Sequence, residues 1–192
     1  MLDKNYWDKR YVDDSATWDI GKVSRPLKEY IDQLTNKEIA VLIPGCGNAH
    51  EAEYLLQQGF TNIILVDISP VAVNTIRQKL AAYLDKQLTV ICDDFFNLQQ
   101  KFDLVIEQTF FCALDPVLRK DYVAKMADII KPGGKLVGVL FNRSFEGGPP
   151  FGGSKAGYEK LFSPEFTINK MEECFNSIEP RKGNELFISF SR

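Results

Sequence analysis

One stretch of the sequence, residues 39–67, constrains the fold more than any other. It begins with the apolar run at 39–43, passes through a turn with two glycines and a helical segment, and ends in a second apolar run that closes on Asp67. Continuous apolar strands are typical of parallel sheets whose faces are covered by helices. The stretch therefore predicts a strand–turn–helix–strand unit of a parallel α/β sheet.

Two features of this unit predict a nucleotide site. Gly45 and Gly47 lack a Cβ, so the turn can be tight and its backbone N–H groups can approach a ligand. Asp67 stands about 20 residues further on, at the tip of the second strand, where a carboxylate can accept hydrogen bonds from ribose hydroxyls. We interpret the pair as a site for an adenosine compound.

Length and charge exclude several classes of protein. A chain of 192 residues is long enough for one domain with a sizeable core and short for two. The net charge of −3 gives no general attraction for nucleic acid or for an anionic membrane. No apolar run approaches the roughly 20 residues that cross a bilayer, and the polar, acidic start resembles neither a secretory signal nor a transit peptide. We therefore expect neither nucleic acid nor membrane as a partner.

The cysteines and the one histidine argue against a metal site. Four cysteines are scattered without a Cys-x-x-Cys pair, namely Cys46, Cys92, Cys112 and Cys174. This pattern favours reduced, packed thiols, Cys112 included, and a cytoplasmic protein. A solvated or capping role is favoured for His50 over that of a catalytic base. Asp93 and Asp94 are adjacent carboxylates without further ligands, so we predict no metal.

The rest of the chain alternates helical and strand patterns. Helices are expected at 24–35, 51–58, 70–84 and 118–130, and strands at 62–66, 88–92, 102–107 and 135–141, with two more strands within 165–192. The long Gly/Pro-rich stretch at 145–157 predicts a functional loop. The alternation predicts one α/β domain with a mostly parallel, seven-stranded sheet, helices on both faces and an antiparallel last strand.

The N-terminal segment, residues 1–23, allows two interpretations. Its aromatic residues lie among charged ones without strand or helix periodicity, and they are Tyr6, Trp7, Tyr11 and Trp18. The aromatics could pin a mobile terminus onto the domain, which the segment by itself favours. Alternatively they form a lid over a cationic or aromatic ligand, because a ring face attracts positive charge.

Phosphate-binding motifs are incomplete in this chain. No Gly-Lys-Ser/Thr follows the glycine turn, which excludes a P-loop. His50 stands where the dinucleotide fingerprint has its third glycine. Glu51 would repel a pyrophosphate but could bind the amino group of a methionyl moiety. Acidic residues after the third and fourth strands, Asp94 and Glu107, add to Asp67 at the strand ends where ligands bind in open α/β sheets.

Together these motifs resemble the class I S-adenosylmethionine-dependent methyltransferases, which are Rossmann-like. More narrowly, they resemble the thiopurine methyltransferase family with its plant and bacterial halide/thiol methyltransferases. The motifs that carry the resemblance span Trp7 to Phe151: W-D-K-R-Y, T-W-D-I-G, I-P-G-C-G, V-D-I-S, D-D-F-F, F-F-C-A-L-D-P, K-P-G-G and G-G-P-P-F. Two positions differ from the pattern of many relatives, Tyr11 in place of Trp and Thr17 in place of Pro.

The resemblance implies a role for each matching residue. The implied contacts to S-adenosyl-L-methionine, or to its product S-adenosyl-L-homocysteine, are Trp7, Tyr11 and Trp18 as a lid, Gly45 and Gly47 at the methionyl part, Asp67 and Ile68 at the ribose, Asp94 and Phe95 at the adenine, and Glu107 or its successors after the fourth strand. The implied acceptor pocket consists of Phe110, Phe111 and Phe151, with Arg119 nearby as the one candidate catalytic residue.

The predicted activity is methyl transfer to a small, soft nucleophile such as a thiol, bisulfide, a halide or a thiopurine. In-line displacement needs alignment more than acid–base help, which fits the absence of an evident base. The prediction comprises one methyltransferase domain, residues 1–192, with residues 1–23 as the lid and a monomer as a plausible state. A non-catalytic methyltransferase-like binding module and, less favoured, an NAD-dependent oxidoreductase remain as alternatives.

Overall fold

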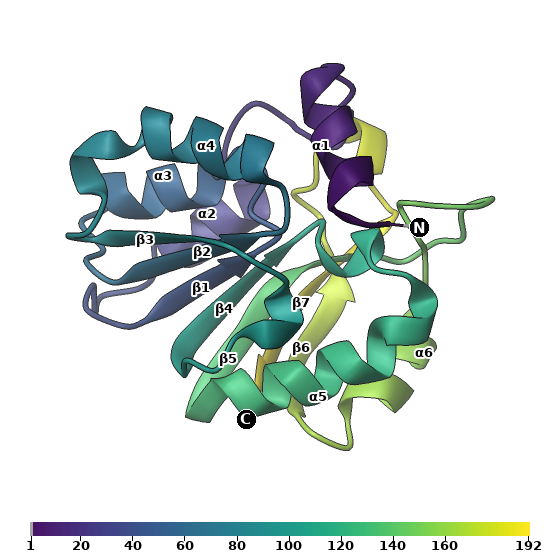
Figure 1. The fold of residues 1–192 in the computed structure, drawn as a ribbon. Coiled ribbons are helices and arrows are strands. Elements are labelled where there is room, and N and C mark those ends of the chain that lie inside the picture. The colour runs from purple at the N-terminus through teal and green to yellow at the C-terminus, as the bar shows by residue number, and fades with distance from the viewer. Residues whose placement is uncertain (1) are drawn as a thin grey trace. The chain divides into compact units, whose positions relative to one another are not determined.

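The apolar runs predicted as strands all form strands in the structure, a computed structural model that describes residues 2–192 (Figure 1). The elements belong to two compact units, the first ending at Leu98 and the second beginning at Gln99. Each unit has its own strands, helices and buried side chains.

Three parallel strands form the centre of the first unit. They are β1 (Val41–Pro44), β2 (Ile63–Asp67) and β3 (Leu88–Cys92), and they lie in the order β3-β2-β1. Val41 pairs with Ile63, and Ile63 in turn pairs with Leu88. Every residue of β1 and β2 is buried, as their continuous apolar character predicts.

Helices cover these strands at positions that the sequence marks. They are α2 (Arg25–Ile31), α3 (His50–Gln57) and α4 (Pro70–Lys79), and Figure 1 shows all three on the same side of β1, β2 and β3. Ser69 caps α4, because its Oγ accepts a hydrogen bond from the N–H of Ala72 at 3.2 Å, and Pro70 occupies the first turn. Short 3₁₀ helices follow at Ala81–Tyr83 and Phe95–Asn97.

The N-terminal segment contains a helix that the sequence did not predict, α1 (Lys4–Val12). Asp3 caps it by accepting a hydrogen bond from the N–H of Tyr6 at 3.0 Å. None of its residues is fully buried, so it lacks the apolar stripe by which amphipathic helices are found. It packs against α4.

Four strands form the second unit, in the order β4-β5-β7-β6. They are β4 (Phe102–Gln108), β5 (Ile130–Phe141), β6 (Thr167–Glu173) and β7 (Glu185–Ser191). β4 and β5 are parallel, whereas β7 is antiparallel to both β5 and β6. The predicted fold class, a seven-stranded, mostly parallel sheet with an antiparallel last strand, is confirmed.

The helices of the second unit are α5 (Arg119–Ile129) and α6 (Lys155–Phe162), with 3₁₀ helices at Phe111–Ala113, Pro116–Leu118 and Glu179–Arg181. α5 was predicted, but α6 begins where a loop was expected. α6 was missed because it contains Gly157, a residue with low helix propensity. Ser154 caps this helix, because its Oγ accepts a hydrogen bond from the N–H of Gly157. β5 also begins earlier than predicted, because Ile130 already pairs with Phe102 ahead of the K-P-G-G sequence.

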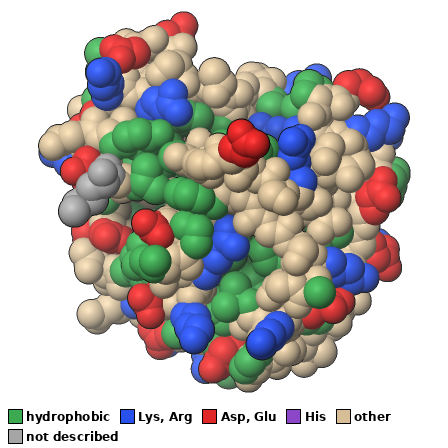
Figure 2. Space-filling model, turned by 90° about the vertical axis from the view of Figure 1, so that its right-hand side faces the viewer, with side chains coloured by type: hydrophobic (Ala, Val, Ile, Leu, Met, Phe, Trp, Pro, Cys, Tyr) green, Lys and Arg blue, Asp and Glu red, His purple; other side chains and the backbone are tan. Residues whose placement is uncertain are grey.

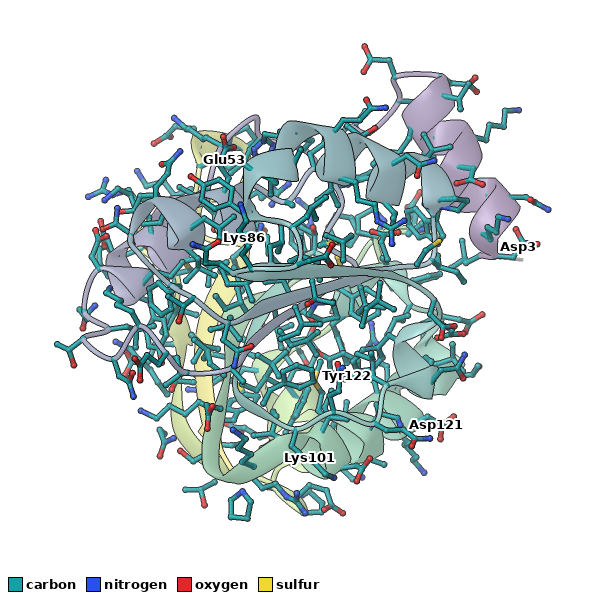
Figure 3. The ribbon with its side chains drawn as sticks, turned by 60° about the vertical axis from the view of Figure 1, so that its left-hand side comes forward. Asp3, Glu53, Lys86, Lys101, Asp121 and Tyr122 are labelled. Carbon is teal, nitrogen blue, oxygen red and sulfur yellow. The ribbon has the colours of Figure 1, made fainter. Side chains whose placement is uncertain are left out.

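Aromatic rings fill the interior of the second unit. Tyr122 of α5 is fully buried and meets the Phe111 ring edge-on with centroids 4.9 Å apart, and Phe162 contacts Phe190 at 5.0 Å. Figure 3 shows Tyr122 pointing inward from α5 while its neighbour Asp121 points outward. Ring pairs of this kind add about 0.5–1.5 kcal/mol each beyond the burial of their area.

On the face drawn in Figure 2, acidic and basic side chains are interspersed among apolar and other atoms. Within residues 2–192, no helix is both long enough and apolar enough to cross a membrane. In the same range the four cysteines are free thiols, and no group of three or more His, Cys, Asp or Glu is placed to hold a metal ion.

A substitution at Gly138 of β5 tests the close contact between β4 and β5. A Cβ at this position would overlap the carbonyl oxygen and the Cβ of Glu107. We expect Gly138→Ala to lower the free energy of unfolding by about 1–3 kcal/mol because the strands must move apart, measured by urea denaturation. Ser189→Ala, on neighbouring β7, removes an atom rather than adding one and serves as the control. An unchanged midpoint for Gly138→Ala would contradict the contact.

Candidate functional site

The glycine turn of the first unit is held by the carboxylate of Asp67. Gly45 and Gly47 both have left-handed backbone conformations, with φ of +55° and +50°. The N–H of Gly47 donates to Oδ2 of Asp67 at 3.1 Å, and the N–H of Ser69 donates to Oδ1 at 2.9 Å. A carboxylate has about four lone-pair sites, so these bonds leave capacity for a ligand hydroxyl.

Asp67 is buried, with 7% of its surface exposed. Burial raises the pKa of its carboxyl group, the nearby charge of Asp8 raises it further, and the backbone N–H groups of Ser69 and Gly47 counteract the rise. Ile68, the predicted ribose neighbour, is half-buried at the end of β2. The end of β2 thus presents a hydrogen-bond acceptor, the Asp67 carboxylate, that is shielded from water, which fits recognition of a ribose.

The three predicted lid residues lie together against this turn. The Trp7 and Trp18 rings meet edge-on with centroids 5.6 Å apart, and Tyr11 meets Trp18 at 5.9 Å. A Cβ on Gly47 would lie 3.1 Å from the hydroxyl oxygen of Tyr11, so the lid contacts the glycine turn directly. Burial and the charge of Asp67 raise the pKa of Tyr11, which keeps its phenol protonated.

Arg10, to which the sequence motifs assign no role, belongs to the same aromatic cluster. Its guanidinium carbon lies 5.5 Å from the centroid of Tyr6 and 5.9 Å from that of Trp18, within cation–π range. Its Nε is buried and has no hydrogen-bond partner among the described residues. A basic residue between aromatic ones in the W-D-K-R-Y motif is the signal that could have identified it.

Two aspartates attach the N-terminal segment to the rest of the first unit. Asp8 of α1 accepts a hydrogen bond from Oγ of Ser69 at 2.5 Å, at the start of α4. Asp19 accepts from the side-chain amide of Asn48, next to Gly47, and lies 2.8 Å from Nε2 of His50. His50 is therefore part of a hydrogen-bonded pair rather than a solvated side chain or a helix cap.

The predicted adenine contacts occupy the end of β3. Asp94 is exposed and caps the following 3₁₀ helix by accepting from the N–H of Phe96 at 3.0 Å. Phe95 is buried and meets Phe96 edge-on at 5.3 Å. Of the pair, Asp94 is accessible to a ligand as the structure stands, whereas Phe95 supports the turn from below.

Glu107 organises the corresponding strand end in the second unit. Its side chain is fully buried, and Oε1 accepts from the N–H groups of Phe110 and Phe111 at 2.9 Å each, while Oε2 accepts from the Tyr122 hydroxyl at 2.7 Å. Burial raises the pKa of Glu107 to about 7, against the lowering effect of these three donors. The carboxylate thereby fixes the turn that follows β4.

The predicted acceptor residues differ in exposure. Phe110 and Phe151 are half-buried, whereas Phe111 exposes 1% of its surface and packs among aromatic rings. The N–H of Phe151 donates to the carbonyl of Cys112 at 2.6 Å, which joins the Gly/Pro-rich loop to the F-F-C-A segment. Cys112 is a buried, packed thiol, and its burial raises the pKa of the thiol well above the usual value.

Arg119 lies beside this junction. One Nη donates to the carbonyl of Gly152 at 2.7 Å, and the guanidinium carbon lies 4.9 Å from the Phe111 centroid. The Nε of Arg119 is buried without a hydrogen-bond partner in the described part of the chain. Arg119 therefore supports the Gly/Pro-rich loop through Gly152.

Comparison with known families and sequences places the chain among methyltransferases. The family model described as thiopurine S-methyltransferase (TPMT) matches residues 2–189. The probable thiol methyltransferase 2 of Arabidopsis thaliana is 30% identical over 186 residues, which cover 93% of this chain and 81% of the relative. The thiocyanate methyltransferase 1 of Brassica oleracea is 27% identical, with 96% and 83% covered.

Solved structures agree on the fold. The 1,6-didemethyltoxoflavin-N1-methyltransferase of Burkholderia thailandensis, solved with S-adenosylhomocysteine, superposes with a TM-score of 0.78 at 17% identity and covers 98% of this chain and 86% of its own. The magnesium protoporphyrin IX methyltransferase of Synechocystis PCC 6803, solved with SAM, has a TM-score of 0.77 at 18% identity and covers 98% and 94%.

Glu107 makes stability depend on pH. Its pKa is about 7 in the folded chain and 4.5 when exposed, so its contribution to stability is complete below pH 4.5 and is lost as the pH rises to about 7. The difference corresponds to about 3 kcal/mol. We expect Glu107→Gln to flatten this decline, because the amide keeps one acceptor oxygen and does not ionise. Urea denaturation of both proteins at pH 5 and pH 8 measures the effect.

Tyr122→Phe is the companion variant, since it removes the donor to Oε2 and keeps the ring. We expect it to destabilise the protein at both pH values and to leave the pH-dependent decline in place. Equal pH dependence of Glu107→Gln and the unaltered protein would contradict the assignment.

Proposed function

The chain belongs to the thiopurine S-methyltransferase family, and we propose that it transfers the methyl group of S-adenosyl-L-methionine to a small, soft nucleophile. The observation that carries the proposal is the buried Asp67 carboxylate bonded to the glycine turn, with the aromatic lid residues beside it. This arrangement suits a ligand with a ribose at one end and a positive charge near aromatic rings.

The proposed cofactor residues of the first unit divide by the part of the ligand that they recognise. Asp67 and Ile68 hold the ribose, Asp94 with Phe95 behind it holds the adenine, and the N–H groups around Gly45 and Gly47 face the methionyl part. Trp7, Tyr11 and Trp18 cover the cofactor. In the second unit we propose the turn that Glu107 fixes, rather than the buried Glu107 carboxylate itself, as the contact after β4.

When bound, the cofactor supplies a methyl group on a sulfonium sulfur; the acceptor attacks that carbon in line, and the electron pair of the broken bond stays on sulfur to give S-adenosyl-L-homocysteine. The protein's contribution is alignment and exclusion of water, and alignment of two reactants can supply about 7–11 kcal/mol of the barrier. Thiolates, bisulfide and halides are already nucleophilic, so no residue has to remove a proton from them.

For the acceptor pocket we propose the two partly exposed rings, Phe110 and Phe151, with Phe111 supporting them from the core. Arg119 orients this loop through Gly152, and the positive charge of its guanidinium beside the Phe111 ring suits an anionic acceptor. The relatives named as thiol and thiocyanate methyltransferases support acceptors whose reacting atom is sulfur. Bisulfide, organic thiols, thiopurines and halides form the class to be tested.

We further propose that residues 1–192 act as one methyltransferase domain, with residues 1–23 as its lid, because a single family model matches residues 2–189. A cytoplasmic setting is supported by the four free thiols, which a reducing compartment preserves. A small molecule is the proposed partner, and nucleic acid is not, given a net charge of −3 and the mixed charges of the surface in Figure 2. A monomer suffices for this activity.

A panel assay tests the activity. The purified protein is incubated with labelled S-adenosyl-L-methionine and, in turn, iodide, bisulfide, an aromatic thiol and a thiopurine. We expect methylated product from at least one sulfur acceptor and tight binding of S-adenosyl-L-homocysteine in calorimetry. Binding without product from any acceptor would indicate a binding module, and no binding at millimolar ligand would refute the proposal.

Asp67→Ala tests the ribose carboxylate. A hydrogen bond to a charged group contributes about 1.5–3 kcal/mol, so we expect the Kd for S-adenosyl-L-homocysteine to rise roughly 10- to 100-fold. Asp128→Ala removes an exposed carboxylate paired with Lys101 and should leave the Kd unchanged. Calorimetry on both variants, each checked for folding by circular dichroism, makes the comparison; equal affinities would remove Asp67 from the site.

A further inference from the structure

The stretch between the lid aromatics Trp7, Tyr11 and Trp18 and the start of α2, residues 19–24, is attached to the glycine turn and to α3 by two carboxylates. At its start, Asp19 bonds to Asn48 and His50. At its end, the N–H of Ser24 donates to Oε1 of the buried Glu51 at 3.0 Å. The segment is therefore fixed at both ends to the same short region, the turn after Gly47 and the first turn of α3.

Both carboxylate oxygens of Asp19 accept hydrogen bonds. Oδ1 accepts from the N–H of Gly21 at 2.6 Å and faces Nε2 of His50, while Oδ2 accepts from the Asn48 amide. Burial by itself would raise the pKa of Asp19, but the hydrogen bonds from Asn48 and Gly21 and the charge of His50 lower it overall. Asp19 is thus an ionised acceptor, for which hydrogen bonds are strong.

The partners of Asp19 belong to the cofactor turn. Asn48 directly follows Gly47, and His50 is the first residue of α3. The residue between them, Ala49, is the helix cap but has no side chain that can bond to the free N–H groups of the first turn. The Asp19 carboxylate consequently places a negative charge near the start of α3, where a helix favours one.

On its other side, Asp19 continues directly into the aromatic lid. Trp18 precedes it in sequence, and the Trp18 ring contacts both Trp7 and Tyr11. Because Trp18 and Asp19 are consecutive residues, the hydrogen bonds of Asp19 also restrict the position of Trp18. Trp18 in turn contacts Tyr11, whose hydroxyl lies beside Gly47. The far end of the lid is fixed separately, through Asp8 and Ser69.

We propose that Asp19, together with His50 and Asn48, forms a tether that positions the aromatic lid on the glycine turn and thereby sets how long the cofactor stays bound. The inference rests on the proposed function, because the lid and the cofactor turn are those of the methyltransferase. Asp19 and His50 are positioning residues: they act through Trp18 and Tyr11 and do not take part in the displacement. The tether governs cofactor retention and product release.

The test compares variants that cut the tether with ones that preserve it. His50→Ala and Asn48→Ala each remove one donor to Asp19, whereas His50→Gln keeps an amide N–H at a similar reach. Asp13→Ala is the matched control, since it removes an exposed carboxylate at the end of α1, outside both the lid aromatics and residues 19–24. Calorimetry with S-adenosyl-L-homocysteine gives the Kd, and displacement kinetics give the dissociation rate.

We expect His50→Ala to raise the Kd for S-adenosyl-L-homocysteine about tenfold, mainly through faster dissociation, since one strong hydrogen bond of the closed lid is lost. His50→Gln should restore most of the affinity, and Asp13→Ala should match the unaltered protein. In turnover, the loss should appear in the KM for S-adenosyl-L-methionine rather than in kcat, because neither residue touches the reacting atoms.

Tryptophan fluorescence gives a readout independent of activity. The chain has two tryptophans, Trp7 and Trp18, and both belong to the lid cluster. We expect His50→Ala to make them more accessible to acrylamide quenching than they are in the unaltered protein or in Asp13→Ala.

Folded His50→Ala and Asn48→Ala proteins with unchanged affinity and unchanged quenching would overturn the tether. That outcome differs from a failure of the proposed function, in which the unaltered protein itself would neither bind the cofactor nor form product.

Discussion

The strand end, the glycine turn and the aromatic cluster of the first unit meet at the hydrogen bond between the buried carboxylate of Asp67 and the N–H of Gly47. The bond joins the end of β2 to the turn that leaves β1, and it requires that turn to have the left-handed conformation that Gly47 adopts. Because Gly47 has no Cβ, the Tyr11 hydroxyl can approach it closely. One interaction therefore aligns the acidic strand end, the backbone donors and the aromatic lid.

The second unit uses the same device with different residues. Glu107 stands one residue before the end of β4, Asp67 stands at the end of β2, and Glu107 too accepts backbone N–H groups of the turn that follows, those of Phe110 and Phe111. In both cases a carboxylate removed from water is retained because fixed donors replace its hydration. The cost of that burial appears as a raised pKa in both residues. Each buried acid thus specifies the geometry of a loop rather than adding charge to a surface.

The sequence was sufficient for the strands, most helices and the glycine turn, because apolar periodicity and turn residues are local signals. It was insufficient for α1, which has no buried stripe, and for α6, which contains Gly157. The hydrogen-bond partners of the acidic residues could not be predicted from the sequence either. Asp19 bonds to His50 across 31 residues and Glu107 to Tyr122 across 15, and no spacing rule links such positions. The sequence also could not distinguish Phe111 from Phe110. Both were predicted to line the acceptor pocket, but the Phe111 side chain is buried in the core.

The engagement of these acids bears on how the reaction is accelerated. Asp67, Glu107 and Asp19 each accept two or more hydrogen bonds from the protein, so their lone pairs serve structure and recognition. A reaction that needed a general base would require a carboxylate or imidazole left free to take a proton. Methyl transfer to a soft anion has no such requirement, since its barrier falls when the two reactants are aligned and desolvated. A chain whose acids hold loops in place and whose aromatic rings pack on the glycine turn suits that kind of catalysis.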